Sequence, residues 1–225
     1  YENTYHTKLE SFGCIAHEEY PYLGASPDGI NVEPTSLLMG RMLEIKNPIS
    51  REITGIPKEE YWIQCQLQME VCDLNQCNFL ECKMSEYQCL DFYIEDTSRD
   101  YKGIIIEYTN KIDKRIRIYS DFNISGQELD DWLTKTRMRV QSEQGNEVNE
   151  IYWYLDDYSV FEVFRDKTWF DQVRPDFQRF WWEVLEHRQK GSWDTIPVRK
   201  SKSKTQRTID LAAVPAAVCL IDDDY

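Results

Sequence analysis

The sequence predicts an α/β fold in which a mixed central β-sheet is flanked by helices. Short apolar runs separated by turn residues fill the first part of the chain, and a helical pattern follows before further strand-like runs return. An order of three strands, a helix and two strands is typical of an α/β domain. With 225 residues, 41% of them hydrophobic, the chain is long enough to bury a substantial core.

The expected elements of the first half come from these patterns. Strands are predicted over residues 12–17, 23–32, 41–47, 77–84 and 88–95. A helix is predicted over residues 56–74, because Pro57 stands near its start and apolar side chains recur at helical spacing. Those side chains are Trp62, Cys65, Met69 and Cys72.

The second half is expected to add an insertion, residues 95–150, to one domain that spans residues 1–196. Ser125 and Glu128 match a capping box, which predicts a helix over residues 128–143. Further expectations are a hairpin over 151–164 that turns at Asp156 and Asp157, a helix with a core-facing stripe of Phe170, Val173, Phe177, Trp181 and Val184, and a mobile tail over 197–225.

Charge and cysteine content bound the function. A net charge of -14 argues against a broad nucleic-acid surface, yet basic residues concentrate at 111–117 and 199–207, where a solvated surface is the alternative. Seven cysteines without a CxxC pair favour reduced thiols in a cytoplasmic or nuclear compartment rather than a secreted protein. No apolar run is long enough for a membrane span, and no leader pattern opens the chain.

Three charged residues suggest a metal site. Asp28 lies in a Pro-Asp-Gly turn, and Glu44 and Lys46 follow at alternate positions, so both would point to one face of a strand while Ile45 faces the core. Carboxylates and a backbone carbonyl are the ligands that a hard cation prefers. An exposed edge strand carrying an ion pair is the alternative. A metal site of this kind supplies what phosphodiester hydrolysis requires.

The predicted helix offers a polar face to this site. Tyr61, Gln64 and Gln68 share one side of the helix, whereas Gln66 projects to the other. Such a face can bond a water or a phosphate oxygen, although an ordinary solvated face would look the same. A serine or cysteine nucleophile has less support, because the three histidines are scattered and neither GxSxG nor a P-loop occurs.

The succession SPDG, LEIKNP and YWIQCQLQM resembles the lambda exonuclease-like (YqaJ-type viral recombinase) nucleases of the PD-(D/E)XK superfamily, especially those of large DNA viruses. The resemblance covers residues 1–94 and, more weakly, 150–188. It implies a restriction-endonuclease-like core and two Mg²⁺ ions, which Mn²⁺ can replace. The implied metal ligands are Asp28, Glu44 and the Ile45 carbonyl, the implied catalytic residues are Lys46 and Gln64, and the supporting matches are Ser26, Tyr61 and Gln66.

The same resemblance implies partners and leaves alternatives. The family uses a further glutamate that would align just before Tyr1, and Glu2 is a poor substitute for it. Expected partners are double-stranded DNA with a free end, a second copy of the chain and a single-strand annealing protein. Arg199, Lys200, Lys202 and Lys204 are the expected DNA contacts outside the core. A nicking or structure-specific endonuclease, an inactive binding module and an iron-sulfur site at Cys72, Cys77, Cys82 and Cys89 are the alternatives.

Overall fold

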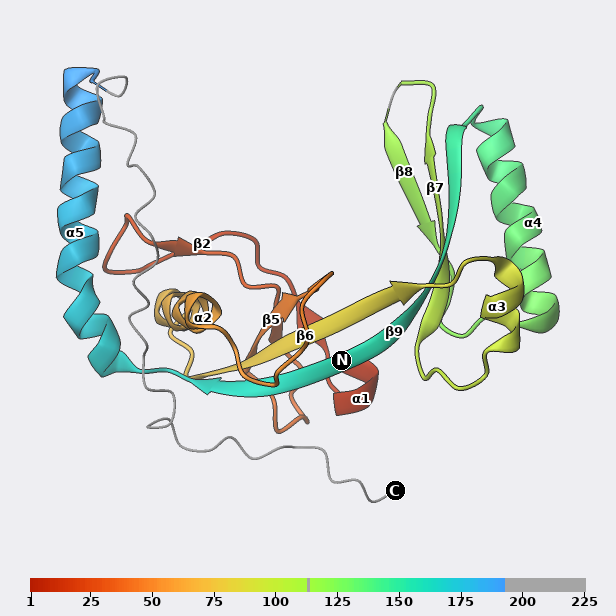
Figure 1. Ribbon diagram of the computed structural model, residues 1–225. Coiled ribbons are helices and arrows are strands. Elements are labelled where there is room, and N and C mark those ends of the chain that lie inside the picture. The colour runs from red at the N-terminus through yellow and green to blue at the C-terminus, as the bar shows by residue number, and fades with distance from the viewer. Residues whose placement is uncertain (113, 193–225) are drawn as a thin grey trace. The chain divides into compact units, whose positions relative to one another are not determined.

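The computed structural model describes residues 1–112 and 114–192 and confirms the α/β fold (Figure 1). A mixed sheet carries helices against it, as the sequence predicts. By their internal contacts the described residues divide into two compact units, which we describe separately: residues 1–45, 54–80 and 160–192 form the first, and residues 46–53 and 81–159 form the second. The expected insertion, residues 95–150, falls inside the second unit.

The first unit is built on a sheet with the strand order β1-β4-β5-β6-β9. The pairs β1/β4 and β4/β5 are antiparallel. A separate small sheet pairs β2 with β3. The elements of this unit, including the strands it shares with the second unit, are α1 (Glu2–Tyr5), β1 (Leu9–Glu10), β2 (Ile15–Ala16), β3 (Gly24–Ala25), β4 (Gly29–Asn31), β5 (Met42–Lys46), α2 (Glu59–Val71), β6 (Gln76–Glu86), β9 (Asn146–Phe164) and α5 (Lys167–Lys190).

Helix α2 anchors the core of this unit. Its expected apolar side is buried, and Glu59 and Glu60 in its first turn suit the positive end of the helix dipole. The core cluster joins α2 to β5, β6 and β9 through Met42, Trp62, Cys65, Met69, Cys77, Phe79 and Val163. The predicted helix is therefore confirmed, and it lies on the strand that carries Glu44.

The second unit contains a sheet with the strand order β6-β9-β7-β8, in which β7 pairs antiparallel with both β8 and β9. Helices α3 and α4 pack on one face, as Figure 1 shows. The core there consists of Tyr93, Ile104, Ile106, Tyr108, Ile124, Leu129, Leu133 and Val140. The elements that belong to this unit alone are α3 (Leu90–Glu95), β7 (Lys102–Thr109), β8 (Arg115–Tyr119) and α4 (Gly126–Ser142).

Two expectations, the strand over residues 88–95 and the hairpin over 151–164, are wrong. Residues 90–95, expected as part of a strand, form helix α3, because Leu90 and Tyr93 at helical spacing both turn to the core and so short a run does not reveal its period. The hairpin is instead one strand, β9, of 19 residues. Neither Asp156 nor Asp157 supplies the positive φ of a tight hairpin turn, and Asp156 pairs with Lys83 at 3.5 Å.

The capping box is only half confirmed. Ser125 is the N-cap of α4, but its side chain makes no capping hydrogen bond. Ser125 instead has the extended backbone typical of an N-cap, and Gly126 follows with a positive φ of 55°. The residue type therefore predicted the N-cap position correctly, but the side-chain hydrogen bond that a capping box implies for Ser125 is not formed.

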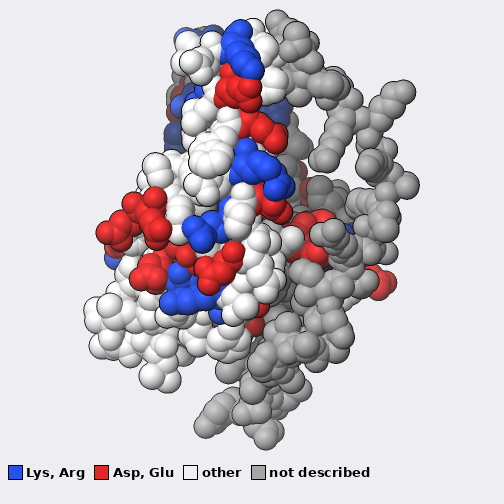
Figure 2. Space-filling view, turned by 90° about the vertical axis from the view of Figure 1, so that its left-hand side faces the viewer, with Lys and Arg blue, Asp and Glu red and all other residues white. Residues whose placement is uncertain are grey.

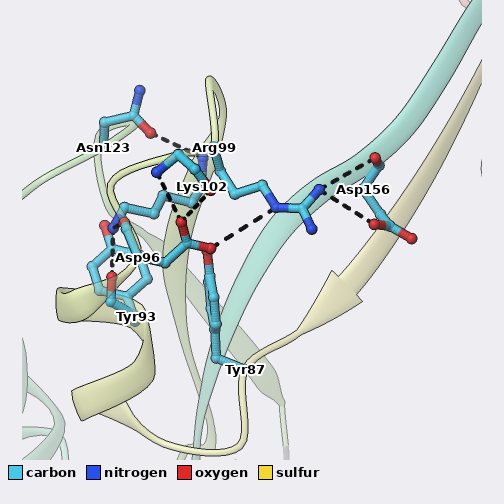
Figure 3. Close-up of polar contacts among 8 residues, drawn as sticks. Tyr87, Tyr93, Asp96, Arg99, Lys102, Asn123 and Asp156 are labelled. Atoms are coloured by element: carbon cyan, nitrogen blue, oxygen red, sulfur yellow. Dashed lines mark hydrogen bonds and ion pairs between the residues drawn. The ribbon is translucent and has the colours of Figure 1, made fainter.

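A buried lysine ties α3 to β7 (Figure 3). The Lys102 ammonium donates to the carbonyl oxygens of Tyr93 and Asp96 and lies 4.3 Å from the centre of the Tyr93 ring. Burial lowers the pKa of Lys102. The Asp96 carboxylate accepts from Ser98 and from the Tyr87 hydroxyl, which brings its pKa to about 2. These bonds fix the connection that leaves α3.

Helix α5 is confirmed, but its aromatic stripe is not core along its whole length. Phe170 is buried, whereas the other four members of the stripe are half-buried. Phe180 and Trp182 are 64% and 62% exposed. Figure 2 looks onto the side of the molecule where α5 lies and shows basic and acidic side chains interspersed there rather than a basic field. Among residues 1–112 and 114–192, no helix combines the length and apolar character of a membrane span.

Candidate functional site

Asp28 stands in the loop between β3 and β4. Its neighbours Pro27 and Gly29 are buried while Asp28 itself is exposed. A Cβ at Gly29 would lie 3.2 Å from the Leu9 side chain, so a larger residue there would require Leu9 to shift by a few tenths of an ångström. The Asp28 Oδ2 atom accepts a hydrogen bond of 2.7 Å from the backbone N–H of Ile45. This bond fixes the carboxylate beside β5, one residue from Glu44.

Glu44 lies on β5 and is only 2% exposed. Gly29, the first residue of β4, pairs with Leu43 across the antiparallel ladder, so Asp28, which immediately precedes β4, comes opposite Glu44. Strand β5 lies between β4 and β6, so the alternative of an exposed edge strand is wrong. The expected division of faces also needs correction. Met42, which shares the Glu44 face, packs in the core beneath α2, so this face is buried rather than open.

Two glutamines of α2 hold the Glu44 carboxylate. Gln64 Nε2 donates to Oε1 at 2.6 Å, and Gln68 Nε2 donates to Oε2 at 2.9 Å. Residues four apart lie on one side of a helix, which explains why both reach the same group. Because Gln68 is only 6% exposed, the solvated-face alternative fails for it. The sequence placed Gln68 on the correct face but gave no sign of its bond to Glu44.

The other residues of the metal-binding prediction adjoin this pair in sequence. Ile45 presents its N–H to Asp28, and its carbonyl is the expected further ligand. Lys46 is the last residue of β5 and is half-buried. Strand alternation gives its side chain the same face as Glu44. The roles of Ile45 and Lys46 in binding and catalysis stay predictions.

The supporting residues have different surroundings. Ser26 is exposed and lines a pocket of about 400 Å³. The pocket is completed by Gly24, Ala25, Glu60, Ile63, Gln64, Leu67 and Gln68. Tyr61 stacks on Phe79 with 5.5 Å between ring centres. The pocket thus borders the glutamines that hold Glu44, whereas Tyr61 faces the core.

Gln66 lies in the interior and ties elements together. Its Nε2 donates to the Phe164 carbonyl at 2.8 Å, and its Oε1 accepts from the Asp166 N–H at 2.6 Å. The side chain is 1% exposed, so it joins α2 to the end of β9 and the start of α5. In this position Gln66 supports the scaffold of the site and does not face the pocket. A direct substrate contact would require the interior to open.

The expected DNA contacts in the tail, Arg199, Lys200, Lys202 and Lys204, lie outside the described residues. The basic run at 111–117 is described except for residue 113. Its Arg115 and Arg117 belong to β8, and both pair with Glu107 of β7. The prediction that these four tail residues contact DNA stays a prediction.

The oxygen donors of this site suit a hard cation, but the site has only two carboxylates. Asp28 and Glu44 offer carboxylate oxygens, and the buried Oε1 of Gln68 has no hydrogen-bond partner. Within residues 1–112 and 114–192, no group of three or more His, Cys, Asp or Glu side chains is arranged to hold a metal. Glu2, whose Oε1 accepts from the Leu9 N–H at 2.7 Å, does not join Asp28 and Glu44 in such a group. Two carboxylates and neutral oxygens are the donors that remain.

A buried thiol pair lies next to the site and keeps its surroundings apolar. A hydrogen bond with Cys65, together with burial, raises the pKa of Cys77 well above its usual value. The Glu44 carboxylate acts in the same direction. Cys77 therefore stays protonated, and the interior beside Glu44 gains no second negative charge.

Comparison with known proteins gives a family match for the site region. Residues 1–75 match the model of the YqaJ-like viral recombinase domain. These residues include Asp28, Glu44, Lys46 and both glutamines that hold Glu44. The match confirms the resemblance drawn from the motifs.

Individual proteins similar to this chain share less than 30% of their aligned residues with it. An uncharacterized protein of Acanthamoeba polyphaga mimivirus is 28% identical over 223 residues, which cover 81% of this chain and 40% of the relative. This chain thus spans less than half of that protein. Two crystal structures of an alkaline exonuclease from Laribacter hongkongensis, one in complex with dAMP, are 21% and 22% identical, each with a TM-score of 0.32. They cover 64% of this chain, and this chain covers 59% and 58% of them.

Proposed function

We propose that this chain, whose residues 1–75 match the YqaJ-like viral recombinase domain, is a divalent-metal-dependent nuclease that digests linear double-stranded DNA from an end. The observation that carries the proposal is the facing pair of Asp28 and Glu44, one bonded to the backbone of β5 and the other held by two glutamines of α2. A buried carboxylate positioned by two amide donors offers oxygen atoms of the kind that a hard cation prefers.

Each residue of the site has a proposed task. Asp28, Glu44 and the Ile45 carbonyl would hold Mg²⁺, or Mn²⁺ in its place, as one ion or two. A bound divalent cation would supply charge neutralisation at the scissile phosphate and make a water molecule more acidic. Lys46 would orient that water or a phosphate oxygen. Gln64 is half-buried and borders the pocket, so it can exchange its Glu44 bond for one to the substrate while Gln68 keeps Glu44 in place.

The biological setting is part of the proposal. The family name and the mimivirus relative support a role in viral DNA recombination, replication or repair. We propose work in the reducing cytoplasm or nucleus of an infected cell, assembly with further copies of the chain, and cooperation with a single-strand annealing protein. An end-directed nuclease leaves single strands, which such a partner would pair. The expected direction of digestion is 5′ to 3′.

The nuclease proposal predicts a difference between two DNA topologies. With Mg²⁺, linear duplex DNA is expected to be digested to small products while covalently closed circular duplex stays intact, because the enzyme requires an end. Gel analysis with and without EDTA measures this. Nicking of the circle would favour the endonuclease alternative. If neither substrate is digested, with or without Mg²⁺, an inactive binding module is favoured.

A second prediction concerns Gln68. Gln68→Leu removes one donor from the Glu44 carboxylate, so nuclease activity is expected to fall about 10- to 100-fold, as it does when support of a metal ligand is lost. The half-saturating Mg²⁺ concentration should rise as well, because Glu44 is less well oriented. Metal titration of the nuclease rate measures both quantities.

The matched control for Gln68 is Gln76→Leu. Gln76 bonds Arg41 at 2.9 Å and does not bond Glu44. Its loss should cost stability without changing the Mg²⁺ requirement. Equal changes in the Mg²⁺ requirement for both variants would show that Gln68 has only a structural role.

A further inference from the structure

The sheet of the second unit has an open face. Along β8, Ile116 and Ile118 pack against the core that α3 and α4 cover. Alternation then turns Arg115, Arg117 and Tyr119 to the opposite face. Both helices of this unit lie on the core side, so within the described part of the unit they leave that opposite face uncovered.

Aromatic side chains gather on this open face. Gly103 of β7 pairs with Trp153 of β9, and a Cβ at Gly103 would lie 2.9 Å from the indole. The absence of that Cβ lets the Trp153 ring lie across the strand. Phe122 meets Trp153 edge-on with 5.9 Å between ring centres, and Tyr101 meets Phe122 at 5.8 Å. Phe122 is 57% exposed, so this group of rings is open to solvent at its surface.

Tyr119 extends the aromatic surface toward β8. It pairs with Ile105 of β7, two positions along from Gly103 on the same face. Its side chain is 61% exposed. An exposed tyrosine and an exposed phenylalanine on a sheet face that carries no helix have no folding role comparable to that of the buried core.

Positive charge adjoins these rings. Arg115 and Arg117 approach the single carboxylate of Glu107 at 3.7 and 2.6 Å, so two guanidinium groups share one negative charge. Both arginines stay more than half exposed, and Lys111 and Lys114 stand exposed in the adjoining turn. Basic side chains thus concentrate at and near the turn between β7 and β8, while the exposed carboxylates of Asp100 and Asp121 stand next to Tyr101 and Phe122 in the sequence.

We propose that this open face, defined by Tyr101, Ile105, Arg115, Arg117, Tyr119, Phe122 and Trp153, binds single-stranded DNA. Unpaired bases stack on exposed aromatic rings, and basic side chains hold the phosphates. Duplex DNA hides its base faces and would gain only the electrostatic part. The proposal extends the proposed nuclease function, since digestion of one strand leaves the other unpaired, but binding itself does not depend on cleavage.

The experiment measures anisotropy of a labelled oligothymidylate with the full chain in EDTA, which prevents metal-dependent cleavage. The double variant Tyr119→Ser/Phe122→Ser is expected to weaken binding about tenfold, because stacking on aromatic rings contributes strongly per base. Both residues are exposed, so the fold should persist. The matched control, Phe92→Ser, changes a ring of α3 that is 51% exposed and should leave the affinity unchanged.

Changes at the charged residues are expected to have opposite signs. Arg117→Ala should weaken binding and reduce the salt slope by about 0.7, as one phosphate contact is lost from a single strand. Glu107→Gln releases both arginines from their shared carboxylate and should tighten binding severalfold. Weaker binding by Glu107→Gln would contradict the role of the two arginines in binding phosphate groups.

Three outcomes would overturn the proposal: no binding of the oligothymidylate, equal weakening by the Phe92 control, or equal competition by a blunt duplex. Digestion of linear duplex DNA is measured separately with Mg²⁺. Normal digestion without single-strand binding would refute this inference alone. Single-strand binding without any digestion would refute the proposed nuclease and leave the open face supported.

Discussion

Asp28→Asn is expected to reduce nuclease activity on the order of a thousandfold with no measurable loss of folding. The substitution removes a carboxylate charge from the proposed cation site, and such a site contributes several kcal/mol to stabilising the transition state. The asparagine oxygen can still accept the hydrogen bond from the Ile45 N–H, which Asp28 now accepts at 2.7 Å. Because position 28 is exposed, no buried donor loses its partner.

The measurement for Asp28 has two parts. Digestion of linear duplex DNA gives the loss of activity, and calorimetric titration with Mn²⁺ gives the loss of affinity independently of turnover. Asp171→Asn, a change of one exposed carboxylate on α5, serves as the control for net charge. Activity within tenfold of the unmodified chain would show that Asp28 does not bind the cation.

Local patterns indicated part of the geometry of the candidate site, whose role stays a prediction. Two-residue alternation placed Glu44 on a face of β5, and helical spacing placed Gln64 and Gln68 on one side of α2. The turn residues around Asp28 indicated a junction next to a strand. The structure joins Gln64 to Glu44 by a bond of 2.6 Å, and it joins Asp28 to the backbone N–H of Ile45, the residue after Glu44, by a bond of 2.7 Å. Short-range geometry therefore determined which side chains could meet.

Long-range partners could not be predicted in this way. Gln66 bonds Phe164 and Asp166, about a hundred residues away, and no local pattern encodes that contact. Nor could alternation show that the Glu44 face lies beneath α2, because a buried carboxylate held by amides has the same sequence pattern as a solvated one. Helix α3 was missed because six residues do not distinguish helical from strand periodicity.

The length of β9 also depends on long-range contacts that the local sequence does not show. An Asp-Asp pair between apolar runs is typical of a turn, and only the ion pairs of Asp156 with Lys83 and Arg99 show why the chain continues. Those partners lie on β6 and in the segment after α3, more than fifty residues earlier. Tertiary contacts thus override a local turn preference here.

Arg165→Met is expected to lower the free energy of unfolding by about 3 kcal/mol, the second large effect. Arg165 follows β9, and its side chain is 7% exposed. It donates from Nε and Nη2 to Glu70 Oε2 at 2.9 and 2.8 Å, and from Nη1 to Asp73 Oδ1 at 2.8 Å. Methionine fills part of the volume but leaves the nearly buried Glu70 carboxylate without its main partner. Urea unfolding, followed by tryptophan fluorescence, measures the change.

The control for Arg165 separates burial from charge. Arg179→Met breaks an exposed ion pair with Asp176, and such pairs contribute at most about 1 kcal/mol. Adding Glu70→Leu to Arg165→Met should restore part of the lost stability, because the stranded carboxylate, rather than the missing attraction, causes most of the cost. Further destabilisation by the second substitution would instead mean that Glu70 has another essential partner. His17, whose Nε2 lies 3.7 Å from Glu70 Oε1, is the residue that the structure offers for that role.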